Sequence, residues 1–139
     1  MSRILRLIPA CAALLVAAFV SAPPSYAGSP HFVANAFVVT ISGSTLTVSG
    51  KEAGLGDETQ VHIEISATAS CINPGSHHPK AANKASVSAA GDFPVQNGKA
   101  TFELSATASF QPDCSPPMTV VFGPITVTDT EHDLSVTLR

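Results

Sequence analysis

The residues that could do chemistry in this chain are few, and two histidines stand side by side among them. His77 and His78 lie in a proline-bounded segment, and His62 or His132 could join them as ligands for copper or zinc. Neighbouring side chains of an extended loop point apart, so such a site needs ligands from elsewhere in the chain. We interpret these histidines as solvated loop residues and expect neither a metal nor another cofactor.

Alternating carboxylates near the end of the chain form a second candidate site. In an extended segment Asp129, Glu131 and Asp133 would point to one side, and calcium takes 6 to 8 oxygen ligands. No EF-hand glycine or closing glutamate follows them. A charged sheet edge that discourages strand pairing explains the pattern equally well, and we adopt that interpretation. Asp57-Glu58 is a weaker carboxylate candidate.

Sequence motifs of known enzyme classes are missing. The chain has no G-x-S-x-G, no H-E-x-x-H and no phosphate-binding glycine loop. Serine, histidine and aspartate are present, but a serine-rich chain offers accidental triads. We therefore predict a protein that is not an enzyme, with a secreted hydrolase or a metal-binding protein as lesser alternatives.

The first 27 residues have the pattern of a signal peptide. Arg3 and Arg6 precede an apolar run over residues 7–20, and Ala27 offers a small residue at the cleavage position. A lipid anchor at Cys11 is the alternative. No later stretch reaches the roughly 20 apolar residues of a membrane span. We predict a secreted, extracellular protein that is not embedded in a membrane.

Two cysteines remain after that segment, Cys71 and Cys114. In an exported chain an isolated pair predicts a disulfide, and a catalytic cysteine would require the bond to be absent. All ten acidic residues but only five of the seven basic ones follow Ala27, without a basic stripe. Nucleic acid is therefore not an expected partner. The same part of the chain has no Trp or Tyr, which argues against stacking on sugars.

Two long stretches position these residues. Over 60–71 and 99–110 apolar and polar residues alternate, which predicts strands with one face on a core. Further strands are predicted at residues 36–42, 45–49, 84–90, 93–95, 118–122, 125–128 and 134–138. Turns are expected at Gly43-Ser44, Gly91-Asp92 and Asn97-Gly98, with a frayed start at 28–31 and a glycine connector at 50–58.

These elements predict an all-β protein, an antiparallel immunoglobulin-like β-sandwich of about seven strands, with residues 28–139 as one domain. Proline-rich loops at 72–83 and 111–117 adjoin the cysteines. The connector motif Gly54-Leu55-Gly56 could be a recognition loop, but glycines that let the chain cross between sheets explain it as well.

Several short motifs carry a resemblance to a known group. A-G-L-G at 53–56, C-x-N-P-G at 71–75, Asn97-Gly98 and a second cysteine in a proline loop resemble small secreted proteins of actinobacteria. That likeness implies export and one disulfide, and it lends no catalytic residue. A looser likeness in size and glycine content is to the chromoprotein apoproteins, which carry a small aromatic ligand, although their two short-loop disulfides are absent.

The function predicted from these observations is that of an extracellular interaction module acting through loops 72–83 and 111–117. The surface would include Asn73, His77, His78 and Asp113. Its partner would be an extracellular protein, a cell-envelope component or a small molecule. The alternative is a carrier of a small apolar ligand, because alanines on the inward rows of both long strands could leave room for a guest.

Overall fold

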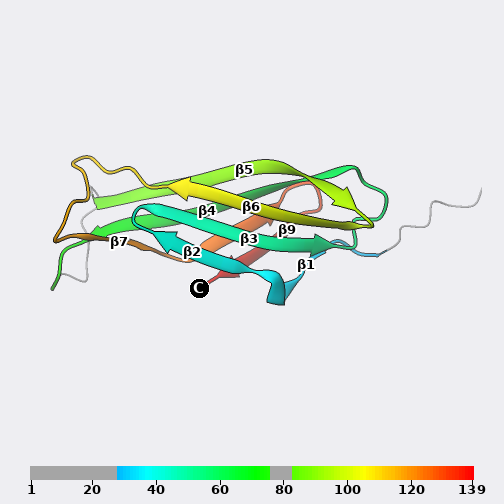
Figure 1. The fold of residues 1–139 in the computed structure, drawn as a ribbon, viewed down its shortest axis with the longest axis horizontal. Helices are drawn as coiled ribbons and strands as arrows, with labels where there is room; N and C mark the ends of the chain where they lie inside the picture. Colours follow the sequence, from blue (N-terminus) through cyan, green and yellow to red (C-terminus); the bar gives the residue numbers. More distant parts are fainter. Residues whose placement is uncertain (1–27, 76–82) are drawn as a thin grey trace, which may run out of the picture.

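The computed structural model describes residues 28–75 and 83–139, which form one antiparallel β structure (Figure 1). The elements are β1 (His31–Phe32), the 3-10 helix η1 (Ala34–Ala36), β2 (Val38–Ser42), β3 (Thr45–Ala53), β4 (Gln60–Ile72), β5 (Lys84–Gln96), β6 (Lys99–Thr107), β7 (Thr119–Phe122), β8 (Ile125–Asp129) and β9 (Leu134–Leu138). The predicted all-β class is confirmed, with nine strands in place of about seven. The predicted signal peptide lies outside the described residues.

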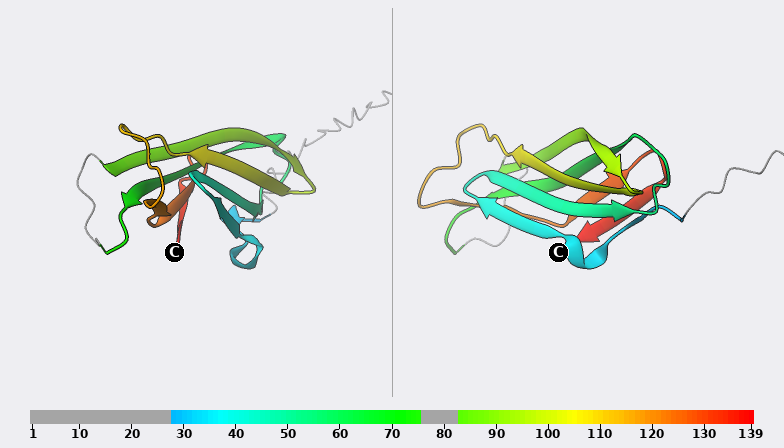
Figure 2. Two further views of the ribbon diagram at one scale, coloured as in Figure 1. Left: turned by 60° about the vertical axis from the view of Figure 1, so that its left-hand side comes forward. Right: turned by 45° about the vertical axis from the view of Figure 1, so that its right-hand side comes forward.

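The strands join in the order β1-β3-β6-β5-β4-β8-β9, while β2 pairs with β3 and β7 with β4. Strand β5 links two halves of this arrangement: residues 84–94 pair with β4, and Val95 and Gln96 pair with β6. The sheet curls so far that β1 and β9, at the two ends of the order, come into contact (Figure 2). The result is a nearly closed, barrel-like sheet.

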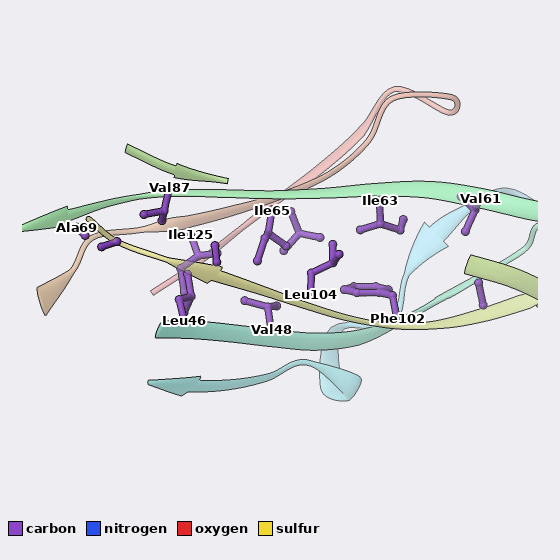
Figure 3. Packing of buried hydrophobic residues seen from close by; sticks show 14 of the residues in the cluster. Leu46, Val48, Val61, Ile63, Ile65, Ala69, Val87, Phe102, Leu104 and Ile125 are labelled. Atoms are coloured by element: carbon purple, nitrogen blue, oxygen red, sulfur yellow. The ribbon is translucent and has the colours of Figure 1, made fainter. Parts of the chain in front are cut away.

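The core lies inside this curl (Figure 3). Val61, Ile63 and Ile65 of β4 are fully buried, as the alternation in 60–71 predicts. They face the inward row of β6, where Phe102 and Leu104 are also buried. Burial of such side chains stabilises the fold by about 1.5–3 kcal/mol each. The two long strands are therefore the frame on which the remaining elements pack.

Two glycines that look like turn residues instead make room for aromatic rings. A Cβ at Gly50 would lie 2.6 Å from the Phe102 ring and 3.0 Å from that of Phe37. Strand β3 accordingly continues through Gly50 to Ala53, and the predicted strand end at residue 49 is wrong. A Cβ at Gly91 would meet Phe93 at 3.3 Å, and β5 runs through this position without the predicted turn.

The hairpin turns follow the predictions more closely. Asn97 and Gly98 both have positive φ, 53° and 71°, the conformation that makes Asn-Gly a tight hairpin turn. Gly43 also has a positive φ, 57°, between β2 and β3. The predicted frayed start is wrong at His31, because His31 and Phe32 pair with Ala53 and Glu52.

Candidate functional site

Two acidic side chains are buried inside the sheet at one end. Glu52 lies on the inward row of β3, which also carries Leu46 and Val48, and Asp129 ends the inward row of β8 after Val127. Both carboxyl side chains have no solvent-exposed surface. Charged residues are almost never fully buried without a partner, so this pair is the feature of the interior that requires an explanation.

Asp129 is held by a turn that forms around it. Its Oδ1 accepts the backbone N–H groups of Glu131, at 2.8 Å, and of His132, at 3.3 Å. Its Oδ2 lies 2.5 Å from Nδ1 of His132. The other ring nitrogen, Nε2, lies 2.8 Å from Oε1 of Glu58, in the connector between β3 and β4. The imidazole of His132 therefore bridges two carboxylates that come from different parts of the chain.

Glu52 differs from these residues in its hydrogen bonding. When Glu52 is ionised, neither of its carboxyl oxygens has a donor, whereas a protonated Glu52 interacts with the Asp129 carboxylate. One ligand atom each from Glu52, Asp129 and His132 lies within 4.8 Å of the others. We call these three residues, with Glu58, the acid cluster. Among the residues that the structure describes, Glu52, Asp129 and His132 are the group of three or more ligating side chains that converges in this way.

Burial and hydrogen bonding together set the protonation states in the acid cluster. Desolvation raises the pKa of Glu52 to about 8, and the nearby Asp129 carboxylate adds to the rise. Burial opposes the ionised form of Asp129 as well, but hydrogen bonding to His132 and to the Glu131 N–H outweighs it, so its pKa is lowered. Burial also opposes charging of His132, yet bonds with Asp129 and Glu58 raise its pKa to about 9. At neutral pH Glu52 is therefore protonated and His132 is an imidazolium.

This geometry corrects the prediction for the carboxylates at 129–133. Residues 130–133 form a turn rather than an extended segment, because Asp129 caps their backbone. Asp129 points inward, whereas Glu131 and Asp133 are exposed. The three carboxylates do not share one side. Glu58, the weaker candidate in the sequence, instead takes part in the cluster through His132.

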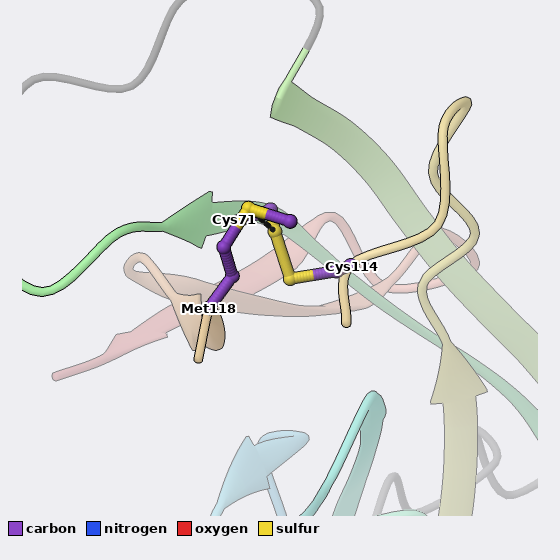
Figure 4. The surroundings of a disulfide bond; sticks show 3 residues. All are labelled: Cys71, Cys114 and Met118. Carbon is purple, nitrogen blue, oxygen red and sulfur yellow. Dashed lines mark hydrogen bonds between the residues drawn. A yellow bond between two sulfur atoms is a disulfide. The ribbon is translucent and has the colours of Figure 1, made fainter. Parts of the chain in front are cut away.

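The residues predicted at the other end of β4 lie around the disulfide. Cys71 and Cys114 are bonded, with their Cα atoms 5.7 Å apart, which confirms the predicted bridge (Figure 4). The sulfur of Met118 lies 3.7 Å from that of Cys71, a packing contact because a bridged cysteine has no thiol proton. Asn73 and Asp113 are exposed beside the bridge. The other two predicted surface residues, His77 and His78, lie outside the described residues.

His62 and the glycine connector each contact other parts of the fold. Nδ1 of His62 lies 2.7 Å from Oδ1 of Asp92, on the solvent-exposed side of β4 and β5, and this bond raises the pKa of His62. Leu55 of the connector is buried, and its N–H donates to the carbonyl of Gly98. The connector therefore packs against the fold, in agreement with the crossing role of its glycines.

The sequence contains a signal for the burial of Glu52. The inward row Leu46, Val48, Gly50 and Glu52 keeps its period of two, but the glycine interrupts its apolar pattern. The burial of Asp129 has a similar signal in the row Ile125, Val127 and Asp129. The sequence does not show that these two rows come close together, because their distance depends on how the sheet curls.

Comparisons with known proteins identify no relative. No family model matches the chain, and neither a curated protein nor a solved structure is significantly similar to it. Within residues 28–75 and 83–139, no helix has the length and apolar character needed to cross a membrane.

Proposed function

We propose that the protein is an exported, non-enzymatic interaction domain that associates with a second copy of itself along β2. One observation carries this proposal: β2 is an uncharged edge strand with exposed aliphatic side chains. Val38, Val39 and Ile41 are 59%, 40% and 51% exposed. Strand β2 pairs with β3 and has no further neighbour among the residues that the structure describes.

Edge strands of this kind are uncommon because they invite pairing with another chain. Natural proteins protect such edges with lysine, proline or inward-pointing charges. The sequence from Phe32 to Gly50 contains no charged residue, so no electrostatic repulsion opposes the approach of a second strand. A second copy is the preferred partner because β2 itself is the extended, uncharged, apolar strand that such an edge accepts.

The residues of β2 suit an antiparallel pair about a two-fold axis. If the axis passes through Thr40, Val39 of one copy lies opposite Ile41 of the other, and the reverse holds by symmetry. Val39 and Ile41 share the parity of their β3 partners, Val48 and Leu46, which are buried. Pairing would therefore extend the apolar face of β3 across the interface, with aliphatic cross-strand contacts.

Sedimentation velocity of purified protein over a range of concentrations tests this. We expect a concentration-dependent dimer, and Ile41→Lys should shift the molecule to the monomer because two lysines would face the interface. Val121→Lys is the matched control, since Val121 is 48% exposed on β7 and should leave the dimer intact. A wild-type protein that stays monomeric, or an Ile41→Lys protein that stays dimeric, would refute the proposal.

The loop beside the disulfide remains a second candidate surface. The exposed segment 111–117, with Asp113, is tethered to β4 by Cys114, and a loop held in place loses less entropy when it binds. Substitution of Asn73 and Asp113 with alanine should leave the β2 dimer unchanged. If it also abolishes attachment to intact cells of the producer, the partner-binding surface lies at this end.

The carrier alternative has less support in the structure. Ala69, Ala106 and Ala108 are buried against the core, and surface hollows along the described residues are lined largely by polar side chains such as Ser66, Thr68, Ser86 and Lys99. Native mass spectrometry of protein from its own producer tests it: a bound small molecule that survives gentle desolvation is what a carrier would give.

We also keep three finer assignments as proposals. Two antiparallel halves that share one core support an immunoglobulin-like arrangement of the strands. The disulfide supports export and removal of residues 1–27, because such bonds persist in oxidising compartments. The likeness to small secreted actinobacterial proteins agrees with export and names no partner. Intact-mass analysis of the secreted protein, with an expected start at Gly28, tests the cleavage.

A further inference from the structure

The acid cluster contains a buried side chain that lacks a hydrogen-bond donor. Glu52 is 0% exposed, and in its ionised form neither of its carboxyl oxygens has a hydrogen-bond partner. A polar group taken out of water without a partner is destabilising. The Glu52 carboxyl lies next to the Asp129 carboxylate and the His132 imidazole, which are themselves ligand types for metal ions.

We propose that Glu52, Asp129 and His132 bind a divalent transition-metal ion, for which zinc is the best match. Carboxylate oxygen and imidazole nitrogen are both common zinc ligands. A 2+ ion would compensate the two buried carboxylates, which otherwise cannot both be ionised at this separation. Three protein ligands would leave one position of a tetrahedral site for a solvent molecule.

A bound ion would replace the proton between Oδ2 of Asp129 and Nδ1 of His132. Oδ1 of Asp129 accepts the N–H groups of the turn, so Oδ2 is the atom that faces His132 Nδ1. With Nδ1 on the metal, Nε2–H would donate to Glu58 Oε1, at 2.8 Å. A carboxylate that accepts the outer N–H of a ligating histidine fixes the ring and its tautomer. Glu58 therefore acts as a positioning residue.

Zinc binding requires the three side chains to rearrange. Zinc binds oxygen and nitrogen at about 2.0–2.2 Å, so two of its ligand atoms are separated by roughly 3–4 Å. Oδ2 of Asp129 and Nδ1 of His132 are 2.5 Å apart, so their direct bond must open to admit the ion. Glu52 lies within 4.8 Å of both and can approach the ion through its side-chain torsions.

The ligand set favours zinc over calcium or magnesium. Calcium takes 6 to 8 oxygens, and magnesium keeps several waters in an octahedral shell. One imidazole and two carboxylates are too few and too mixed for either ion, whereas they suit the borderline ions of the later transition series. The competing occupant is a proton on Glu52, which the experiment must distinguish from a metal.

Isothermal titration with zinc chloride tests the proposal on metal-free, untagged protein purified after export. We expect one zinc ion per chain, and Glu52→Gln should weaken binding at least tenfold. Glutamine matches the shape of the protonated Glu52 side chain, so this variant should fold. Glu58→Gln should weaken binding roughly 10- to 100-fold, the usual effect of losing an outer carboxylate. Replacing zinc with cobalt(II) adds a visible spectrum that reports a four-coordinate nitrogen and oxygen site.

Two control variants separate this site from other histidines. His62→Gln alters a histidine whose Nδ1 also lies close to a carboxylate, at 2.7 Å from Asp92, but which belongs to no three-ligand group within the described residues. A double change of His77 and His78 to glutamine removes the adjacent pair. Both should keep the wild-type zinc affinity. Absence of saturable zinc binding, equal binding by Glu52→Gln, or loss of binding in either control would overturn the proposal and leave a protonated Glu52 beside the Asp129 carboxylate.

Discussion

The two ends of β4 are closed by different chemistry. At the C-terminal end, Cys71 is bonded to Cys114, which ties segment 111–117 to the strand. Near the other end Ile63 pairs with Asp129, whose carboxylate belongs to the acid cluster. The offset of eight residues between Ile63 and Cys71 corresponds to roughly 26 Å of strand. One end of β4 is therefore held to its neighbours by a covalent bond, and the other end lies beside titratable groups.

The disulfide and the acid cluster affect the stability of different states of the protein. In the chain-entropy account the bridge destabilises the unfolded chain by restricting it, largely independently of pH. The acid cluster acts in the folded state, where buried charges are costly unless they are paired. The disulfide end should therefore contribute a constant stabilisation, and the acid end a contribution that depends on pH and on any bound ion. Four changes test this difference.

The largest effect should come from the disulfide end. Replacement of both Cys71 and Cys114 with alanine should lower the free energy of unfolding by about 2–5 kcal/mol. Urea denaturation of variant and wild type measures this. Wild-type protein in a reducing agent is the control, because it should approach the stability of the variant. A loss below about 1 kcal/mol in the variant would show that the bridge is not the main closure at this end.

Asp129→Ala should have the largest effect at the acid end. It removes the acceptor for His132 and for two backbone N–H groups, and we expect a loss of about 2–4 kcal/mol because Asp129 is buried while His132 is partly exposed. Glu131→Ala is the matched control in the same turn, since it retains the backbone N–H and removes an exposed side chain. Equal destabilisation by both variants in urea melts would mean that the turn, and not the buried carboxylate, sets the stability.

The sequence is informative to different degrees at the two ends. The cysteine pair, in a segment otherwise free of cysteine, predicts the bridge without any knowledge of the fold. The strand at 60–71 is also predictable, because its inward row from Val61 to Cys71 keeps an unbroken alternation. Both predictions depend on local pattern alone.

The acid cluster could not be predicted to the same degree. Glu52 follows Gly50 in a stretch whose glycines resemble a connector. Gly50 instead makes room for the ring of Phe102, which lies far away in the sequence. Asp129 could be assigned to an inward row, but its contact with His132 depends on a turn that the carboxylate itself caps. Strand β1 could not be predicted for a related reason: it is too short to show a pattern, and it forms by pairing with β3.

A change of pH should affect the acid end through Glu52. Its pKa is raised to about 8 in the folded protein, so between about pH 4.5 and 8 the folded state holds a proton that the unfolded state releases. Stability should therefore fall as pH rises through this range, by at most about 1.4 kcal/mol per pH unit from this group. The raised pKa of His132, about 9, continues the decline above its ordinary value of 6.5.

Glu52→Gln separates these contributions. In buffer that contains a metal chelator, the stability of the variant should not decline between pH 5 and pH 6.5. In this range His132 is still charged in the folded and the unfolded state. Its remaining pH dependence should begin only near pH 6.5. Denaturant midpoints at four or five pH values measure both slopes. An unchanged slope below pH 6.5 in Glu52→Gln would show that Glu52 does not hold a proton in the folded protein.

The smallest effect on stability should come from Asp92→Ala, which uses an exposed pair as the counterpart of the buried one. His62 and Asp92 are 2.7 Å apart and His132 and Asp129 are 2.5 Å apart, but the first two side chains are 39% and 57% exposed whereas that of Asp129 is 0% exposed. Loss of the Asp92 carboxylate should lower the pKa of His62 toward its ordinary value, because the bond to Asp92 is what raises it. NMR titration of the His62 ring measures this shift. Water screens exposed pairs, so the free energy of unfolding should not change measurably. If Asp92→Ala instead destabilised the protein as much as Asp129→Ala, burial would not be the property that distinguishes the acid cluster from the surface pair.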